Sequence, residues 1–579
     1  MSENRIDLTR LLNDKQRKVC LSSENFIVTA CPGSGKTRTV IYRLAYLQEK
    51  YPDSRKYNIA ITYTNRAADE ICNRLDTLGI NMDNIWTGTI HQFCMHFIIR
   101  PYSMYSDALK KGYHIIDEYV QKKYLAEISS LLGIDVGFDN PLNYPVIKEN
   151  YEYLLKKNKE IDFSMILRYS LELVRKNSFI AENLSKIIRS IHVDEYQDTN
   201  EWQYNILAEI VQKNRKINVV FVGDKNQAIY GNLGGIVKTR IELEKLYGIA
   251  FREECLDGCY RSTQRLVDYY TNFEISRTGI YSVAKIKDKQ GVISYNKTIH
   301  KDSLADEIAK IIKKQLDQGI PSREICIVGP QWYDIFALSN RLRKLLPDIP
   351  FDAPDIAPFK YDRLNPFYLL ARLLFTRAGE HTIIRKRLAA EVIEILQDEY
   401  QITFPEGYDI YDLLNVANVP YAQTADGLIT FESAVKRFIK QANIKGNSAE
   451  ELFEKCQVFI EKAEDRIKRN KLPHTCSDFC QCFKEREGVV INTIHGVKGE
   501  EYTTMIGFDL VNFRLPHKSY YFEKKDKRHD DTNKLLYVLC SRAKENLFLF
   551  SERGRNTKNI YSLAPTDELV EVRFKYDSI

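Results

Sequence analysis

The chain has 579 residues, a net charge of +6 and 44% hydrophobic residues, which suggests several folded domains and excludes a disordered or fibrous chain. No secretory signal opens it, no apolar run of about 18 residues interrupts it, and its 12 cysteines are scattered. We therefore expect a reduced, cytoplasmic protein without membrane spans, whose mild positive charge permits nucleic-acid binding without demonstrating it.

Short apolar strands alternate with helical spacing in the first part of the chain. Each predicted strand ends in a turn or in acidic residues, and strand–turn–helix units in series predict a parallel sheet covered by helices. Ligands of such sheets bind at the carboxyl ends of the strands. The predicted strands are 26–30, 58–62, 191–194 and 218–222, and the predicted helices between them include 37–47 and 67–75.

Two stretches lack strand patterning and have helical spacing, so we interpret them as insertions. A second strand–helix pattern begins near residue 291 and resumes after the second stretch. The fold class is therefore α/β, with two parallel-sheet domains that each carry a mostly helical insertion. The predicted division is 1–100 with 186–285 around insertion 101–185, and 286–379 with 485–579 around insertion 380–484.

The turn after residues 26–30 carries a phosphate-loop pattern in a strand-before, helix-after context. Its glycines let backbone N–H groups point at phosphate oxygens, Lys36 adds a charge for the β- and γ-phosphates, and the Thr37 hydroxyl ligates Mg²⁺. Ala30 replaces the first glycine of the strict pattern, and a chance Gly-rich turn is the alternative interpretation. The residues assigned to the nucleotide here are Ala30, Gly33, Ser34, Gly35, Lys36, Thr37 and Thr39.

An acidic pair, Asp194 and Glu195, closes the strand at 191–194. Asp194 can hold Mg²⁺, and Glu195 can orient and deprotonate the attacking water. Alone, the pair would be read as an acidic turn. Together with the phosphate loop it predicts nucleotide hydrolysis with ATP and Mg²⁺ as cofactors.

Phosphoryl transfer develops negative charge on the γ-phosphate, and a cation delivered there accelerates it by roughly 10³-fold or more. Arg261 and Arg542 are the candidates, although either arginine alone would be read as a surface residue. Each follows a segment that contains an aromatic residue, Tyr260 and Tyr537 respectively.

The ordered set of motifs resembles the UvrD/Rep family of superfamily 1 helicases over nearly the whole chain. The resemblance implies two RecA-like motor domains and an ATP-hydrolysing DNA helicase. It implies that Gln16 reads adenine, Tyr260 stacks on adenine and Glu501 faces the ribose. It also implies that Gln227 senses the γ-phosphate and that Arg261 and Arg542 act as arginine fingers. The quoted motifs lie at residues 12–17, 61–68, 88–93, 194–198, 222–230, 260–263, 493–502 and 538–544.

The same resemblance implies contacts with DNA, either single-stranded or as a tailed duplex, and a 3′→5′ polarity. Aromatic, hydroxyl, amide and imidazole side chains of four motifs would make these contacts. The residues carried over are Tyr63, Thr64, Asn65, His91, Tyr230, Thr493 and His495.

The sequence departs from the family where a base-stacking Trp is expected. Asn232 and Leu233 occupy this place, and base–aromatic stacking is worth about 1–3 kcal/mol per base. Two functions therefore stay open: a helicase or translocase in DNA repair or anti-phage defence, and a DNA-sensing ATPase switch that regulates a partner nuclease. The small size resembles the helicase-like subunit of Gabija-type anti-phage systems, whose partner is an OLD-family ATPase/TOPRIM nuclease.

Two further features admit two interpretations each. A cluster of His474, Cys476, Cys480 and Cys482 lacks a Cys-x-x-Cys hook, so a buried helix face competes with a metal site. The mixed charge run at 523–529 is read as a solvated loop, with contact to the DNA backbone as the alternative.

Overall fold

The structure is a computed structural model. It describes residues 11–52, 55–137, 140–231, 234–353, 358–359, 362, 364–376, 382–470, 472–483, 487–522, 524–556 and 562–578. The chain forms two compact units. We call residues 1–89, 185–354 and 486–579 the sheet unit, and residues 90–184 and 355–485 the helical unit.

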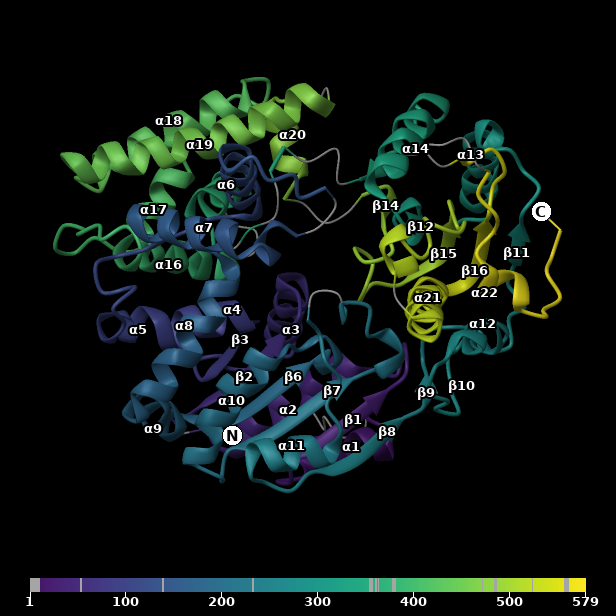
Figure 1. Cartoon of the computed structure of the whole chain (residues 1–579), viewed down its shortest axis with the longest axis horizontal. Helices are drawn as coiled ribbons and strands as arrows, with labels where there is room; N and C mark the ends of the chain where they lie inside the picture. Colours follow the sequence, from purple (N-terminus) through teal and green to yellow (C-terminus); the bar gives the residue numbers. More distant parts are fainter. Residues whose placement is uncertain are drawn as a thin grey trace. The chain divides into compact units, whose positions relative to one another are not determined.

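The first sheet of the sheet unit is fully parallel (Figure 1). Its strands are largely buried except for the edge strand β8, where only the last residue is buried. Helix α2 (Lys36–Lys50) packs against α1 (Asp14–Leu21) and α3 (Asn65–Thr77), and α10 (Glu201–Lys213) packs against α11 (Arg240–Tyr247). The strand order is β3 (Ile85–Thr89), β2 (Tyr57–Thr62), β6 (Ile188–Asp194), β7 (Asn218–Gly223), β1 (Phe26–Ala30) and β8 (Arg252–Leu256).

The second sheet is also parallel, and its strands come from two distant parts of the sequence. Helix α13 (Lys301–Asp317) packs against α14 (Trp332–Leu345), while α21 (Lys525–Cys540) packs against α12 (Gln264–Tyr270) and α22 (Asp567–Glu571). The strand order is β11 (Ile293–Asn296), β16 (Ala543–Phe550), β15 (Tyr502–Gly507), β12 (Ile325–Gly329), β14 (Val489–Thr493) and β13 (Phe351–Asp352).

The two sheets share apolar packing. One buried cluster joins Cys31 and Ile229, which follow strands of the first sheet, to the core of the second sheet. A short pair of strands, β9 (Gly258–Cys259) and β10 (Tyr281–Ser282), lies on the segment between them. The predicted fold class, α/β with parallel sheets and helical insertions, is confirmed.

The helical unit is built from two stretches of helices. The first stretch contains α4 (Ile90–Cys94), the π-helix η2 (Met95–Ile99), α5 (Arg100–Tyr102), α6 (Glu118–Leu131), α7 (Pro145–Asn158), α8 (Phe163–Lys176) and α9 (Ser178–Ile187), with strands β4 (His114–Ile115) and β5 (Glu160–Ile161). The second contains α15 (Pro366–Leu374), α16 (Thr382–Asp398), α17 (Ile410–Ala417), α18 (Gly427–Gln441), α19 (Asn447–Asn470) and α20 (Cys476–Gln481).

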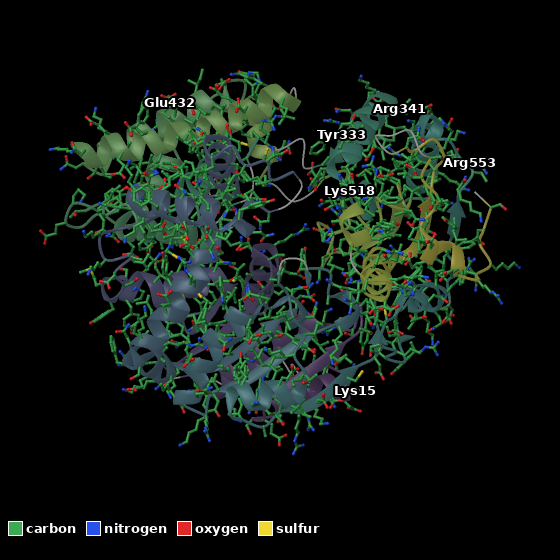
Figure 2. All side chains as sticks on the ribbon, in the orientation of Figure 1. Lys15, Tyr333, Arg341, Glu432, Lys518 and Arg553 are labelled. Atoms are coloured by element: carbon green, nitrogen blue, oxygen red, sulfur yellow. The ribbon has the colours of Figure 1, made fainter. Side chains whose placement is uncertain are left out.

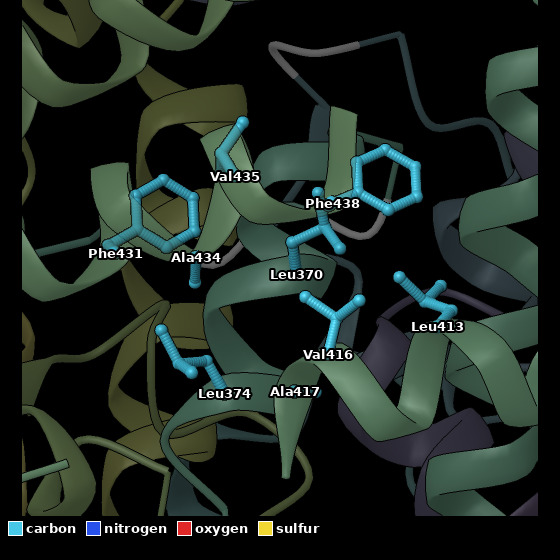
Figure 3. A pocket seen from close by; sticks show the side chains of 9 residues that line it. All are labelled: Leu370, Leu374, Leu413, Val416, Ala417, Phe431, Ala434, Val435 and Phe438. Atoms are coloured by element: carbon cyan, nitrogen blue, oxygen red, sulfur yellow. The ribbon is translucent and has the colours of Figure 1, made fainter. Parts of the chain in front are cut away.

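An apolar cavity lies inside the second stretch of the helical unit, among helices α15, α17 and α18 (Figure 3). Its volume is about 10 Å³, near the smallest that holds one water molecule, and its lining is hydrophobic. It is a packing gap within a core that includes Leu370, Leu413 and Phe431. It offers no polar group for a ligand.

The cysteine cluster of the sequence lies on and beside α20. The Cys476 thiol donates to the hydroxyl of Thr430 at 3.2 Å, and the side chain of Cys476 is buried. Across the described parts of the chain, no group of His, Cys, Asp and Glu side chains could hold a metal ion. In the same parts, no helix has the length and apolarity needed to cross a membrane.

Candidate nucleotide site

The phosphate loop joins β1 to α2 through two residues in the left-handed region. Gly33 has φ +70° and Gly35, the N-cap of α2, has φ +82°. A Cβ atom at Gly33 would come within 2.5 Å of the Arg261 Cβ, so this position needs glycine for space as well as for conformation. The loop presents the N-terminus of a 15-residue helix, whose free N–H groups and dipole favour a phosphate.

The acidic pair lies at the carboxyl end of β6, opposite the phosphate loop. The hydroxyl of Thr37 lies 3.3 Å from Asp194 Oδ2, and the Lys36 ammonium lies 3.6 Å from Glu195 Oε1. Glu195 has φ +55°, a conformation that is uncommon for a residue other than glycine. This turn directs the two adjacent carboxylates at different partners.

The two carboxylates differ in their electrostatic surroundings. Burial, together with the charge of Glu195, raises the pKa of Asp194 to about 7. Burial would also raise the pKa of Glu195, but Lys36 and then Lys498 outweigh it and lower this pKa to about 2. Glu195 is therefore held as a carboxylate, the form that a general base requires.

A chain of hydrogen bonds runs from the first sheet to Arg542 beyond α21. Gln227 Nε2 donates to Asp224 Oδ2 at 2.8 Å, and Arg542 Nη2 donates to Gln227 Oε1 at 2.8 Å. Arg542 is only 2% exposed, and burial lowers the pKa of its guanidinium to about 10. Gln227 thus has one amide atom toward the buried acid and one toward the buried arginine.

Arg261 lies directly beside the phosphate loop. The N–H of Tyr260 donates to the carbonyl of Gly33 at 2.8 Å, which fixes the backbone that carries Arg261. Arg261 Nε donates to Glu501 Oε2 at 2.7 Å, and its Nη1 donates to the carbonyl of Ser541 at 2.8 Å. The arginine is held between the two sheets, next to the place where a phosphate would bind.

A buried ion pair that the sequence analysis did not assign joins the sheets a second time. Lys498, in the turn after β14, donates to Asp198 of η5 (Tyr196–Asp198) and to the carbonyl of Gln227 at 2.6 Å. Both side chains are nearly inaccessible. Asp198 and Lys498 both lie inside motifs that resemble those of the helicase family. They are 300 residues apart, so no local sequence pattern pairs them.

The part of the site where the sequence analysis expects adenine is built from α1 and Tyr260. Gln16 Nε2 donates to the carbonyl of Ser34 at 2.9 Å, and Asn13 Nδ2 donates to the hydroxyl of Tyr260 at 2.9 Å. Lys15, labelled in Figure 2, fixes α1 by an ion pair of 2.8 Å with Asp257. The remaining nucleotide candidates are local: Ala30 ends β1, Ser34 lies in the loop, and the Thr39 hydroxyl donates to the carbonyl of Gly35.

Three of the predicted DNA-contacting residues lie together in the sheet unit. The rings of Tyr63 and Tyr230 stack at 4.5 Å, and the hydroxyl of Tyr230 donates to the carbonyl of His495. The Lys498 ammonium lies 5.0 Å from the centre of the Tyr230 ring. One lysine therefore contacts both the aromatic pair and the Gln227 segment of the nucleotide site.

The other predicted DNA-contacting residues have local roles or lie elsewhere. Thr64 caps α3, Asn65 begins it, and Thr493 ends β14 and accepts a hydrogen bond from the N–H of Gly496. His91 belongs to the helical unit, where its ring lies 5.6 Å from Phe163 and burial lowers its pKa to about 4. Asn232 and Leu233 lie outside the described residues.

The oxygen atoms of Thr37 and Asp194 suit Mg²⁺. A hydroxyl and a carboxylate 3.3 Å apart, beside a phosphate-binding helix end, form the kind of oxygen donor set that Mg²⁺ takes up together with nucleotide phosphates. Their separation and chemistry fit the ion without any change of residue.

Two parallel sheets that share one phosphate-loop site, with acids from one sheet and arginines held beside it, define an ATP-hydrolysing motor of the helicase class. Comparisons with known proteins agree. Residues 12–140 and 142–248 match the UvrD/REP helicase N-terminal domain, and residues 421–554 match the UvrD-like helicase C-terminal domain. The chain belongs to the UvrD-like family of superfamily 1 helicases, which are ATP-dependent DNA helicases.

Similar proteins include ATP-dependent DNA helicase PcrA from two species. The protein of Staphylococcus epidermidis is 23% identical, over 95% of this chain and 84% of its own length. The protein of Staphylococcus aureus is 22% identical, over 94% of this chain and 83% of its own length. The resemblance to UvrD/Rep helicases and the predicted ATP hydrolase activity are confirmed.

Proposed function

We propose that this protein is a helicase or translocase that moves 3′→5′ on single-stranded DNA and opens tailed duplexes, in DNA repair or anti-phage defence. The observation that supports ATP-driven movement is the hydrogen-bonded chain Asp224–Gln227–Arg542, which joins the two sheets beside the nucleotide site. A change at the γ-phosphate would alter the partners of Gln227 and Arg542. The relative position of the two sheets would then follow the state of the nucleotide.

In this proposal the chain's own residues divide the chemistry. The α2 N-terminus and Lys36 bind the phosphates, Glu195 accepts the proton of the attacking water, and Arg261 and Arg542 stabilise the developing charge. Mg²⁺, held by Thr37 and Asp194, would neutralise phosphate charge when bound with ATP. Gln16, Tyr260 and Glu501 would orient the base and the ribose.

For DNA we propose that the stacked pair Tyr63–Tyr230 receives a base, assisted by His495 and Thr493 of the same unit. His91, in the helical unit, is proposed separately as a DNA contact. Thr64 and Asn65 would contact DNA from the start of α3. The Oδ1 atom of Asn65 is buried without a hydrogen-bond partner among the described residues, and as an acceptor it could receive an N–H of a base rather than contact the phosphate backbone. The division into motor domains 1–100 with 186–285 and 286–379 with 485–579, and insertions 101–185 and 380–484, is part of this proposal.

The test is Glu195→Gln measured against the wild type. Losing the general base should lower ATP turnover by about 10²–10⁴-fold while a fluorescent ATP analogue still binds. Wild-type ATPase should rise with single-stranded DNA, and the enzyme should unwind a 3′-tailed but not a 5′-tailed duplex. Normal turnover by Glu195→Gln would refute the assigned base, and unwinding of the 5′-tailed duplex alone would refute the polarity.

The alternative function is a DNA-sensing ATPase switch that regulates a nuclease partner, such as the OLD-family ATPase/TOPRIM nuclease of a Gabija-type system. The specific observation in its favour is Asn232-Leu233 in place of the expected stacking Trp. DNA-stimulated ATPase without unwinding of either tailed duplex would favour this switch. An adjacent nuclease gene would favour the defence role over repair.

A further inference from the structure

The loop after β15 carries an exposed stack of side chains outside the nucleotide site. The rings of Phe513 and Tyr521 are parallel within 13° at a centroid distance of 4.1 Å. The guanidinium of Arg528, on α21, lies 4.4 Å from the centre of the Tyr521 ring. The order is therefore Phe513, Tyr521, Arg528, and we call these three residues the ring stack.

The outer end of the ring stack is open to solvent. Phe513 is 42% exposed, and in the described part of the chain no further ring or cation is recorded against it. The exposed face has the shape and polarity that a planar base would cover.

The loop holds Phe513 in a conformation that only its surroundings can maintain. Phe513 has φ +68°, in the left-handed region that bulky side chains rarely occupy. Its backbone N–H donates to the Tyr521 hydroxyl at 3.3 Å. Below it, Val511 and Leu515 are buried, and the N–H of Asn512 donates to the carbonyl of Ala564.

A buried ionic cluster fixes the same loop to the neighbouring strand ends. Arg514 pairs with Asp334 at 3.7 Å and with Asp509 at 3.8 Å, and it donates to Gln331. Arg555 adds a hydrogen bond of 2.6 Å to Asp334. The ring stack is therefore preformed rather than assembled by a ligand, which lowers the entropic cost of binding.

The ring stack also lies on the edge of the sheet where the predicted DNA residues lie. Strands β14 and β15 are both parallel to β12 and flank it, so their carboxyl ends share one edge. Thr493 ends β14 and His495 follows it, whereas Phe513 follows β15. Two strand spacings, roughly 10 Å, separate these strands, which is a short distance for a polynucleotide to bridge.

Exposed aromatic residues also follow β12, the strand between β14 and β15. Trp332 and Tyr333 begin α14, directly after β12, and are 44% and 80% exposed. Tyr333 and Lys518 are labelled in Figure 2, and both extend from the surface of this part of the sheet unit. Aromatic side chains thus follow each of the three adjacent strands β15, β12 and β14.

The charges around the ring stack favour a polyanion. The segment 514–528 contains six Lys and Arg residues, of which Arg514 is already paired in the ionic cluster, and two acidic ones. The nearby acids Asp567 and Glu568 already accept hydrogen bonds from Asn512 and His529. Stacking faces beside cations are the chemistry with which proteins bind single-stranded nucleic acid without reading its sequence.

We propose that the ring stack is a second base-stacking platform for single-stranded DNA, in which one base covers the open face of Phe513 and Arg528 attracts the adjoining phosphate. This proposal rests on the proposed DNA function and adds a binding site to it. The platform lies on the second sheet, whereas the missing stacking Trp belongs to a loop of the first.

The experiment measures binding of fluorescein-labelled oligo(dT) by anisotropy, with the full chain in its native form. Phe513→Ala and Phe513→Leu should each weaken binding roughly 5-fold to 150-fold, because Leu keeps apolar volume but has no π face. Phe513→Trp, which keeps an aromatic face, should bind oligo(dT) with wild-type affinity. Arg528→Ala should reduce the slope of log affinity against log salt by about 1.

The matched control is Tyr51→Ala. Tyr51 is 38% exposed and has the Arg189 guanidinium 3.8 Å from its ring centre, but it lies at the C-terminal end of α2, away from the carboxyl edges. Its loss should leave oligo(dT) binding unchanged. Equal melting temperatures and equal DNA-free ATPase rates should show that all variants fold.

An oligonucleotide with abasic sites separates stacking from charge. The wild type should lose affinity for it, and Phe513→Ala should lose less, because its stacking contact is already absent. If both Phe513 variants bind oligo(dT) like the wild type, the platform is refuted while the proposed function stands. If the wild type itself does not bind oligo(dT), the proposed DNA function fails and the platform fails with it.

Discussion

The two sheets of the sheet unit have the same number of strands, all parallel, yet their carboxyl edges carry different chemistry. The edge of the first sheet has a glycine-rich loop, a lysine and a row of carboxylates, and it is arranged to hold a nucleotide. The carboxyl edge of the second sheet has a closed ionic cluster and exposed aromatic rings. The second sheet contacts the first through Lys498, between β14 and β15, and through Arg542, directly before β16. The comparison teaches that the loops, rather than the sheet, decide what a parallel sheet binds.

The largest expected effect on this division of roles between the two sheets comes from Lys36→Ala, at the start of α2. Removing the ammonium that faces the phosphates should lower ATP turnover by at least about 10³-fold and weaken ATP binding. Steady-state phosphate release and nucleotide binding measure both effects. Lys50→Ala, at the other end of α2, is the matched control and should be near wild type; a Lys36 variant that hydrolyses ATP normally would remove the phosphate loop from the mechanism.

Arg542→Ala tests whether the second sheet supplies charge to the first. Losing this arginine should lower turnover by about 10³-fold with modest loss of ATP affinity, because its charge matters most in the transition state. Arg542→Lys should recover only part of the rate, since a lysine cannot reproduce the planar guanidinium. The control is Arg265→Ala, which removes an arginine paired with Asp577 at 2.8 Å.

A melting measurement must accompany Arg542→Ala, because this side chain is buried. Wild-type melting with lost turnover supports a role in catalysis. Wild-type turnover in a folded Arg542→Ala protein would show that the second sheet contributes no charge to hydrolysis.

Gln16→Ala tests the part of the nucleotide site on α1, where the adenine base is expected. One lost hydrogen bond to the base should raise the KM for ATP by about tenfold and reduce the preference for ATP over GTP. Turnover at saturating ATP should change little. Competition between ATP and GTP measures the preference; an unchanged ratio would show that Gln16 only supports the loop through Ser34.

The last test concerns pH and the ionic cluster of the second sheet. Burial raises the pKa of Asp509 to about 8, although Arg555 opposes the shift. The folded protein therefore binds this proton more tightly than the unfolded chain does, so stability falls as pH rises between 3.8 and about 8.

Asp509→Asn should remove this fall in stability. The melting temperature of the variant relative to wild type should be higher at alkaline than at mildly acidic pH. Asp317→Asn, at an exposed acid that ends α13, is the control and should follow the wild type at every pH. Parallel curves for Asp509→Asn and wild type would show that the acid is already ionised in the fold.

Local patterns predicted much of the fold and placed several residues of the candidate site. The strand that precedes Gly33 and the strand that ends at Asp194 are short apolar runs, and the structure contains both strands. The family resemblance indicated residues far apart in sequence, such as Gln227 and Arg542, which the structure brings within 2.8 Å. The roles of these residues remain predictions.

Other features could not be predicted because they depend on tertiary contacts. The Lys498–Asp198 pair forms only when two sheets meet, and neither residue has a local pattern that names its partner. The stack of Phe513 on Tyr521 depends on a left-handed residue and on an ionic cluster assembled from three strand ends. The sequence presented this segment as a charge run, and its aromatic partner became evident only in three dimensions.

The strand order of the second sheet has a consequence for how the chain is made. Within the described residues, strand β11 pairs with β16 alone, whose residues follow about 250 positions later, and β12 lies between two strands that are also synthesised late. The first sheet is complete once β8 has left the ribosome, whereas the second must wait with exposed strand edges until nearly the whole chain is available. Pairing across such long separations is slow and prone to aggregation. Early termination after the first sheet would therefore leave a nucleotide-binding half without Arg542.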